Sequence, residues 1–501
     1  MKKAVVIGAG FGGLSAAGYL ARAGYAVTVV EKNGWVGGRA RVLERDGFRF
    51  DMGPSWYWMP EEHDRWFRDM GRERKEYYEI RRVDPSYKVF FGDSEPRERD
   101  NVVTVPADLE KAKALFEHYE AGAGKRLGEY LESCRRKYDL AMTNYIYKNY
   151  NSLFDFVSPT TIRNLATLNI ATSYKGMIRK YFRHPYLRKI LEFPVVFLGS
   201  SARKTPAVYT LMNYIDFILG TWYPTGGFGR VVEAMMEVDA ALGAEFRFST
   251  AVRSLDLEGN KVTGVVCEGR EGAYRLEADV VVANADYHHV EQQLLPESHR
   301  SFSAASWERR SLAPGVLNYY IGLNRKLENF AHHVFFFDSD WDRHFRAVYE
   351  KPGWLEKPLF YAHVPSITDP SCAPEGKEAL FVLVPIAPGL DDTPEIRERY
   401  REDVLDRIEA LTGESIKDHI EFVESYSLND FERDYNAYKG NAFGLGQTLF
   451  QTAYFRTANH SKKVENLYFA GHYTVPGTGT TMSTISGKVA SMRVQEEHPV
   501  S

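Results

Sequence analysis

Residues 3–31, KAVVIGAGFGGLSAAGYLARAGYAVTVVE, decide the fold of this 501-residue chain. Residues 3–7 are a short apolar run, residues 12–23 have helical spacing with many small side chains, and residues 26–30 are β-branched and apolar. Two parallel strands joined by a helix need a right-handed crossover and a covered sheet. The stretch therefore predicts an α/β fold with a Rossmann-like start.

Gly8, Gly10 and Gly13 form a G-x-G-x-x-G pattern between the first strand and the first helix. Gly8 permits a tight turn, Gly10 lets the backbone approach a pyrophosphate, and Gly13 allows close helix packing. The helix N-terminus then faces the negative charge. Glu31 ends the second strand, where its carboxylate can accept a hydrogen bond from a ribose hydroxyl. The pattern predicts a dinucleotide-type cofactor but does not choose between NAD and FAD.

A second glycine pair follows in Gly37-Gly38-Arg39. It suggests further backbone approach to the cofactor, and the Arg39 guanidinium can reach a phosphate. The alternative is a surface turn with a solvated arginine. Residues 51–55, DMGPS, form another tight segment of mostly small residues that we expect close to the cofactor.

Near the C-terminus, residues 466–471 are predicted to form a strand, 476–481 a glycine-rich turn, and 482–492 a helix. This arrangement predicts a second helix N-terminus that could hold an electron-rich edge of the cofactor. The alternative is a capped terminal helix that packs on the sheet.

Composition excludes several classes of protein. Hydrophobic residues make up 44% and charged residues 26%, which excludes a mainly disordered chain. The net charge of -4 gives no basic field, so nucleic acid is not expected as a partner. The three cysteines lie far apart and His288-His289 is interpreted as a helix start, so no metal site is predicted and a reducing cytoplasm fits best. No apolar run approaches the roughly 18 to 20 residues of a spanning helix, so membrane contact is expected to be peripheral.

Changes of character along the chain predict two domains. The cofactor domain is assembled from residues 1–75, 220–300 and 441–501. Residues 76–219 and 301–440 are assigned to a mixed α+β substrate-binding domain with a helical, membrane-facing part. Its expected elements are helices at Asp108–His118 and Ala123–Asn144, and strands at Val316–Leu323, His333–Phe337 and Leu380–Val384.

Five stretches together resemble the bacterial-type phytoene desaturase family of carotenoid biosynthesis. They are VVIGAGFGGLSAAGYLARAGYAVTVVEKNGWVGGRA (5–40), FDMGPSWYW (50–58), TWYPTGGFGRVVEAM (221–235), NADYHHVEQQLLP (284–296) and NLYFAGHYTVPGTGTTMSTISGKVAS (466–491). The first two are shared with amine oxidases and many other flavoproteins and imply FAD, while the others point to carotenoid enzymes.

The resemblance implies roles for individual residues. FAD-binding positions are Gly8, Gly10, Gly13, Glu31, Gly38 and Arg39, and Val252 is similar to the residue whose backbone meets the adenine. Gly471, Thr480, Thr481 and Met482 fall where the last segment of the family approaches the flavin. His472 stands where many related flavoproteins carry an acid, which leaves the ribityl contact open.

The resemblance further implies an FAD-dependent oxidoreductase that desaturates phytoene to lycopene by successive hydride transfers to flavin. A hydrocarbon offers no acidic proton, so the cofactor must perform the difficult step, and no catalytic base is assigned. One complete dinucleotide fingerprint leaves no evident site for a nicotinamide, so a quinone or oxygen is expected to take the electrons. Alternatives are 3,4-desaturation, cis-trans isomerisation or terminal oxidation of carotenoids, a flavin amine oxidase, or a flavoprotein that only carries carotenoid.

The expected location is the cytoplasm, at the surface of the cell membrane, where carotenoid intermediates would enter. Residues 175–189 interleave basic with aromatic and aliphatic side chains. Such a stretch could lie on an anionic membrane surface, or it could be a solvated amphipathic segment on the protein's own core.

Overall fold

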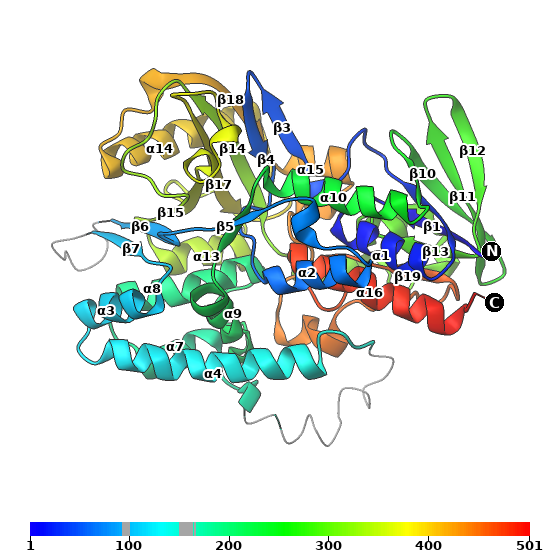
Figure 1. Cartoon of the computed structure of the whole chain (residues 1–501), viewed down its shortest axis with the longest axis horizontal. Helices are drawn as coiled ribbons and strands as arrows, with labels where there is room; N and C mark the ends of the chain where they lie inside the picture. Colours follow the sequence, from blue (N-terminus) through cyan, green and yellow to red (C-terminus); the bar gives the residue numbers. More distant parts are fainter. Residues whose placement is uncertain (93–100, 150–163, 165–166, 501) are drawn as a thin grey trace.

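The computed structural model describes residues 1–92, 101–149, 164 and 167–500 (Figure 1). Residues 93–100, 150–163 and 165–166, which belong to the predicted substrate-binding domain, and residue 501 lie outside the described part. Both ends of the chain lie at the same end of the molecule, where the Tyr25 hydroxyl donates to the His498 carbonyl at 2.6 Å.

A parallel five-stranded sheet holds the N-terminal motif. Its order is β19 (Leu467–Phe469), β13 (Val280–Ala283), β1 (Lys3–Ile7), β2 (Ala26–Val30) and β9 (Glu245–Arg247). Every neighbouring pair is parallel, and helix α1 (Phe11–Arg22) joins β1 to β2. The predicted strand, helix and strand and the α/β class are therefore confirmed, and β-strands far apart in the sequence complete one sheet.

Helix α16 (Thr480–Glu497) packs closely against α1. The Ser15 hydroxyl donates to the Thr484 carbonyl at 2.6 Å. A Cβ atom added at Gly487 would overlap the carbonyl oxygen of Gly12, so the two helices meet backbone to backbone. Helix α16 begins two residues before the predicted start, because the turn ends at Gly479.

Three more strands form a small antiparallel sheet beside the cofactor domain's main sheet. These are β10 (Ala251–Glu258), β11 (Lys261–Gly269) and β12 (Gly272–Glu277). The other short elements that surround the two sheets are β3 (Val42–Arg45), β4 (Phe48–Asp51), α2 (Pro60–Asp69), β5 (Ile80–Arg82), β8 (Trp222–Pro224), α10 (Gly227–Ala241), α11 (Tyr287–His289) and α12 (Ala304–Glu308).

A seven-stranded mixed sheet forms the centre of the region predicted to bind substrate. Its order is β18 (Ile420–Tyr426), β14 (Gly315–Leu323), β17 (Glu378–Ile386), β16 (Phe360–His363), β15 (His333–Phe337), β6 (Tyr87–Phe91) and β7 (Val102–Val105). The three predicted strands in this region are confirmed as parts of β14, β15 and β17. Helices α13 (Trp341–Tyr349), α14 (Pro394–Thr412) and α15 (Leu428–Tyr435) pack around it.

Residues 76–219 include more than the two predicted helices, because β6 and β7 add two strands to the edge of this sheet. β6 pairs in parallel with β15, and Phe90 stacks on Phe336 with ring centroids 5.3 Å apart. The β6 sequence, YKVFF, has the aromatic and β-branched content of a strand, but the many charged residues around it dominated the composition of the region.

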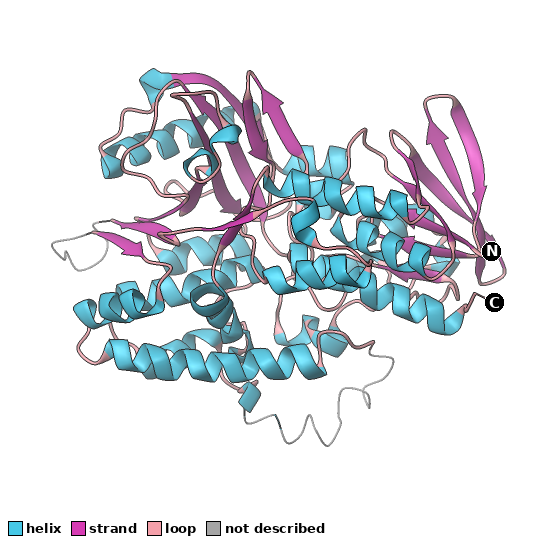
Figure 2. Cartoon of the chain, in the orientation of Figure 1, coloured by secondary structure: helices cyan, strands magenta, loops and turns pink. Residues whose placement is uncertain are grey.

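The predicted helices of this region are confirmed as α3 (Leu109–Tyr119) and α4 (Ala123–Asn144). With α7 (Tyr174–Tyr181), α8 (Pro185–Glu192) and α9 (Leu211–Tyr214) they form a helical layer beside the mixed sheet (Figure 2). The Asp108 side chain caps α3 by accepting the Lys111 amide at 2.9 Å. Of the helices that the structure describes, none combines the length and apolar composition needed to cross a membrane.

The basic-aromatic stretch 175–189 lies on α7 and α8. Lys175 is buried and its ammonium pairs with Asp342 at 2.8 Å. The apolar side chains of the stretch are buried in the protein's own core, namely Met177, Ile178, Phe182, Tyr186 and Leu187. Only basic side chains, such as Arg179, Lys180 and Arg183, face solvent. The apolar side chains therefore pack on the protein's own core, while contact of the exposed basic side chains with an anionic membrane surface stays a prediction.

Candidate functional site

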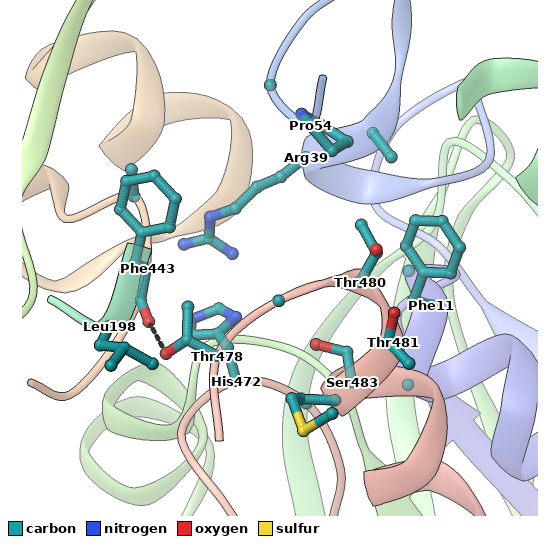
Figure 3. Close-up of a pocket in the computed structure, with 18 of the residues that line it drawn as sticks. Phe11, Arg39, Pro54, Leu198, Phe443, His472, Thr478, Thr480, Thr481 and Ser483 are labelled. Atoms are coloured by element: carbon teal, nitrogen blue, oxygen red, sulfur yellow. Dashed lines mark hydrogen bonds between the residues drawn. The ribbon is translucent and has the colours of Figure 1, made fainter. Parts of the chain in front are cut away.

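A cavity of about 600 Å³ connects the N-terminal glycine turn with the helical layer and the mixed sheet. Its walls come from the ends of β1, β2, β13 and β19, the start of α16, and side chains of α4, α9, α13, β15 and β16. One end is built largely from glycines and polar groups, and the other from aromatic and aliphatic side chains. Figure 3 shows part of this wall, where segments from both ends of the chain meet.

The glycine turn forms one wall of the cavity. Gly8 and Gly10 line it, and Gly10 precedes α1 without any side-chain cap for the first helical amides. Gly13 does not line the cavity, and a Cβ atom there would overlap the carbonyl oxygen of Gly8. The geometry thus fits the separate roles expected of Gly10, which leaves space for a ligand, and Gly13, which brings the helix close to the strand.

Glu31 lies at the end of β2 beside the turn and is only 6% exposed. Its carboxylate accepts the amides of Ala9 at 2.9 Å and Asn33 at 2.8 Å. Burial raises the pKa of Glu31, and the two backbone hydrogen bonds oppose that rise. The side chain therefore joins the glycine turn to the loop after β2, a contact that the sequence pattern did not indicate.

Val252 lies on β10 next to this polar end. It lines the cavity and is 8% exposed, and the Thr250 amide before it donates to the Glu31 carbonyl at 2.9 Å. Glu31 and Val252 therefore bound the same end of the cavity, where the resemblance expects ribose and adenine.

Arg39 extends from the second glycine turn into the cavity (Figure 3). Its Nη2 donates to the Asn441 carbonyl at 3.3 Å, while its buried Nε has no hydrogen-bond partner among the described residues. Gly38 has a positive φ of 56° and lies against Gly10, since a Cβ atom added there would be 3.6 Å from the Gly10 Cα. The guanidinium therefore keeps donor capacity for an anionic group beside the first turn.

The C-terminal segment closes the opposite wall. A Cβ atom at Gly12 would lie 2.9 Å from the Gly471 amide nitrogen, so the start of α1 is in contact with the turn that follows β19. Helix α16 begins with Thr480, Thr481 and Met482, which line the cavity. No side chain caps the start of this helix. The second helix N-terminus predicted from the sequence thus faces the cavity (Figure 3).

His472 also lines the cavity, near Arg39 (Figure 3). Its buried Nε2 has no hydrogen-bond partner among the described residues. Burial, with the nearby charges of Arg39 and Arg456, holds the pKa of His472 well below its ordinary value. The imidazole is therefore neutral and has a nitrogen free for a bound ligand, where related flavoproteins carry an acid.

These observations fit FAD. Two uncapped helix starts line this cavity together with Gly10 and with one nitrogen each of Arg39 and His472 that has no partner among the described residues. The predicted cofactor residues other than Gly13 all line this one cavity. Their individual contacts with FAD stay predictions.

The other end of the cavity is apolar. Its lining includes Met142, Ile146, Phe335, Phe337, Trp341, Phe345 and Leu383, drawn from helices and strands that are distant in sequence. The sequence could indicate an aromatic-rich chain but not which rings face the cavity. This part suits a long hydrocarbon better than a polar substrate.

His288 and His289 start α11, as interpreted from the sequence. The Asp286 carboxylate caps this helix by accepting the His289 amide at 3.2 Å.

Comparisons with known proteins agree with this geometry. Residues 11–495 match the family model described as flavin containing amine oxidoreductase. The chain is 42% identical over 484 residues to the carotenoid 3,4-desaturase of Haloarcula japonica, covering 96% of each. It is 32% identical over 502 residues to the zeta-carotene-forming phytoene desaturase of Myxococcus xanthus, covering 98% of this chain and 94% of the relative. A solved oxidoreductase from Methanosarcina mazei, 16% identical, matches 99% of this chain and 100% of its own with a TM-score of 0.64, which bears on the fold alone.

Proposed function

The chain belongs to the flavin-containing amine oxidoreductase family and, within it, to the carotenoid desaturases, and on that premise we propose that it desaturates a carotenoid at the 3,4 bond. The cofactor is FAD. The observation that carries the proposal is the continuity of the cavity, which runs from the glycine turn into an aromatic-lined space. The more similar of the two carotenoid relatives bears the name of a 3,4-desaturase.

Bound FAD supplies the hydride acceptor for removal of hydrogen from carbon. The protein's own task is to hold a hydrocarbon that offers no hydrogen-bonding group. Rings such as Phe335, Phe337 and Trp341 can do this by apolar burial, which also keeps water from the reacting carbons. Thr481 and Gly471 line the same cavity as the glycine turn and these rings, so a carbon held where the polar and apolar parts join would meet the cofactor.

A second candidate is the conversion of phytoene to lycopene by several successive desaturations. It is supported by the identity of 32% to a phytoene desaturase across nearly the whole chain. Both candidates need the same cofactor site and an elongated apolar space, and they differ in which bond reaches the junction.

We further propose that a quinone or oxygen reoxidises the protein at the cytoplasmic surface of a membrane. The segment after β13 carries no second glycine fingerprint for a nicotinamide. Phe450 and Phe455 are 77% and 50% exposed, with ring centroids 6.3 Å apart, and Phe455 also lines the cavity. These rings, rather than residues 175–189, offer an apolar contact for lipid beside a cavity entrance.

The test supplies FAD-loaded protein with lycopene or phytoene in liposomes that contain a quinone. Chromatography and absorbance would identify the product. Conversion of lycopene to a product with an additional double bond at the 3,4 position supports the first candidate. Conversion of phytoene to lycopene supports the second. If neither carotenoid is converted and neither bleaches the flavin without oxygen, both candidates are wrong.

A further inference from the structure

A line of hydrogen bonds leads from the cavity wall into the mixed sheet. Ser55 and Tyr361 line the cavity. The Tyr361 hydroxyl donates to Ser55 Oγ at 3.0 Å, and the same oxygen lies 2.6 Å from His333 Nδ1. Trp56 stacks on the His333 ring with centroids 3.9 Å apart and an interplanar angle of 9°, which fixes the orientation of the imidazole.

His333 has a nitrogen that no contact explains. It is fully buried, and its Nε2 has no hydrogen-bond partner in the described part of the chain. Behind it lie His332 and His363, whose Nε2 atoms are 3.0 Å apart, and one ring nitrogen of each of the three histidines lies within 4.8 Å of the others. A buried polar atom without a partner costs free energy and therefore calls for an explanation.

By spacing alone, the three histidines could hold a metal ion. His332 Nε2 and His363 Nε2 lie 3.0 Å apart, however, at the distance of a hydrogen bond between the two rings, and a metal ion would have to replace that hydrogen bond. A single proton is a smaller charge and need remain only between steps of a reaction. A closed metal site would also leave the hydrogen bonds that join His333 to the cavity through Tyr361 unexplained.

Desaturation takes a hydride and a proton from neighbouring carbons, so the proton must leave an apolar space. We propose that Tyr361, coupled to His333, accepts this proton, with the further histidines as the next stage of the route. The inference rests on the proposed carotenoid desaturation. It makes Tyr361 a catalytic residue and His333 its proton acceptor.

The proposed proton transfer accounts for each bond that forms and breaks. After hydride removal leaves a cation, a neighbouring C–H bond breaks and its electron pair forms the new double bond. The step uses the His333 tautomer with its proton on Nε2, so that Nδ1 can accept. The Tyr361 hydroxyl turns from Ser55 towards His333 and its proton passes to Nδ1, while the proton from the carbon adds to the Tyr361 oxygen. The proton is then held on the His333 imidazolium, and ring nitrogens of His332 and His363 within 4.8 Å are the next sites that could receive it.

The electrostatics suit transient charge. Burial lowers the pKa of His332 to about 3 and holds the pKa values of His333 and His363 well below their ordinary values. A carbocation is a far stronger acid than any imidazolium, so even a weak base suffices, and a weak base releases the proton readily. The Asp369 carboxylate opposes the lowered pKa of His332 and supplies negative charge at the outer end of the route.

The decisive experiment uses FAD-loaded full chain and a carotenoid that the wild type converts. General acid-base groups contribute about 10²- to 10⁴-fold, so Tyr361→Phe should lower kcat by about 100-fold with unchanged KM and flavin content. Deuterium at the carbon that loses the proton should give a larger isotope effect on kcat than in the wild type. His333→Asn, which keeps a polar group near Nδ1 but no base, should show the same pattern and decides the matter if Tyr361→Phe does not fold.

The matched control is Tyr320→Phe. Tyr320 is a buried tyrosine of the same sheet whose hydroxyl donates to the Met52 carbonyl at 2.8 Å, and it does not line the cavity. A kcat for Tyr361→Phe and His333→Asn equal to that of this control, or an unchanged isotope effect, overturns the route while leaving carotenoid desaturation intact. A wild type that neither converts nor is bleached by any carotenoid instead overturns the proposed function, and the route with it.

Discussion

Replacing Gly10 with valine separates cofactor binding from folding. Gly10 has φ of -84° and ψ of 178°, a conformation that valine adopts without strain. A Cβ atom at this position meets Asn284 Oδ1 at 2.9 Å, and the next neighbours are 4.0 Å away. Because the close atom is the end of a side chain, the protein can make room by a small movement of Asn284. We therefore expect the cofactor-free variant to unfold like the cofactor-free wild type.

Bound FAD has less freedom to move away from residue 10 than the Asn284 side chain has. The added carbons lie where the backbone at the start of α1 would approach the pyrophosphate. Forcing extra carbon atoms into a filled space costs about 1–3 kcal/mol, and the upper value corresponds to about a 100-fold weaker Kd. Gly13→Ala provides the contrast, because its Cβ would overlap the backbone oxygen of Gly8 and should destabilise the protein itself.

The assay is the flavin-to-protein absorbance ratio after gel filtration, together with denaturant unfolding of the cofactor-free proteins. Gly10→Val should be stable but should retain much less flavin than the wild type, whereas Gly13→Ala should lose both stability and flavin. Stoichiometric flavin in Gly10→Val would refute the position assigned to the cofactor. Strong destabilisation of cofactor-free Gly10→Val would refute the claim that Asn284 can yield.

Further predictions concern other parts of the molecule. Glu31→Ala leaves the Ala9 and Asn33 amides without their acceptor, so flavin titration should give weaker rather than lost binding, and unfolding should show a loss of about 1–3 kcal/mol. Burial raises the pKa of Asp216 to about 7, so the folded state binds the extra proton between about pH 4 and 7 and the free energy of unfolding falls as pH rises through that window. Asp216→Asn should therefore gain stability relative to wild type as the pH rises from about 4 to 7, and a difference independent of pH would contradict this. Replacing both Phe450 and Phe455 with serine should weaken co-sedimentation with liposomes at unchanged flavin content, and undiminished binding would remove these rings from the membrane contact. Without oxygen, substrate should bleach the flavin and an added quinone restore it, whereas turnover only with NAD(P)+ would contradict the proposed acceptor.

The sequence could predict the cofactor half well because its rules are local. The glycine turn, the strands on either side of α1 and the small-residue start of α16 each follow from short spacings with a known backbone requirement. Gly13 illustrates this, since the packing role expected from the pattern agrees with its overlap with Gly8. The resemblance then supplied the pairing of the N-terminal and C-terminal segments, which periodicity alone cannot give.

The substrate half was predictable in its elements but not in their contacts. His333 lies beside Tyr361 because β15 pairs with β16. The register of that pairing cannot be predicted from the sequence of either strand. The same holds for β6, whose parallel partner β15 lies far along the chain. Residues 175–189 show the same difficulty for helices. An amphipathic pattern does not reveal whether its apolar side meets lipid or the protein's own core.

The parallel sheet that carries the glycine turn has a consequence for synthesis of the protein. β1 emerges first from the ribosome, but its neighbour β13 and the next strand β19 follow much later, and α16 comes after them. Until then the edge of β1 that pairs with β13 and the face of α1 that packs on α16 have no partner, and unpaired strand edges and uncovered apolar faces of this kind favour aggregation. A chain whose translation stops before β19 would lack one wall of the cavity. Flavin uptake would therefore distinguish chains that contain this last strand and helix from chains that end before them.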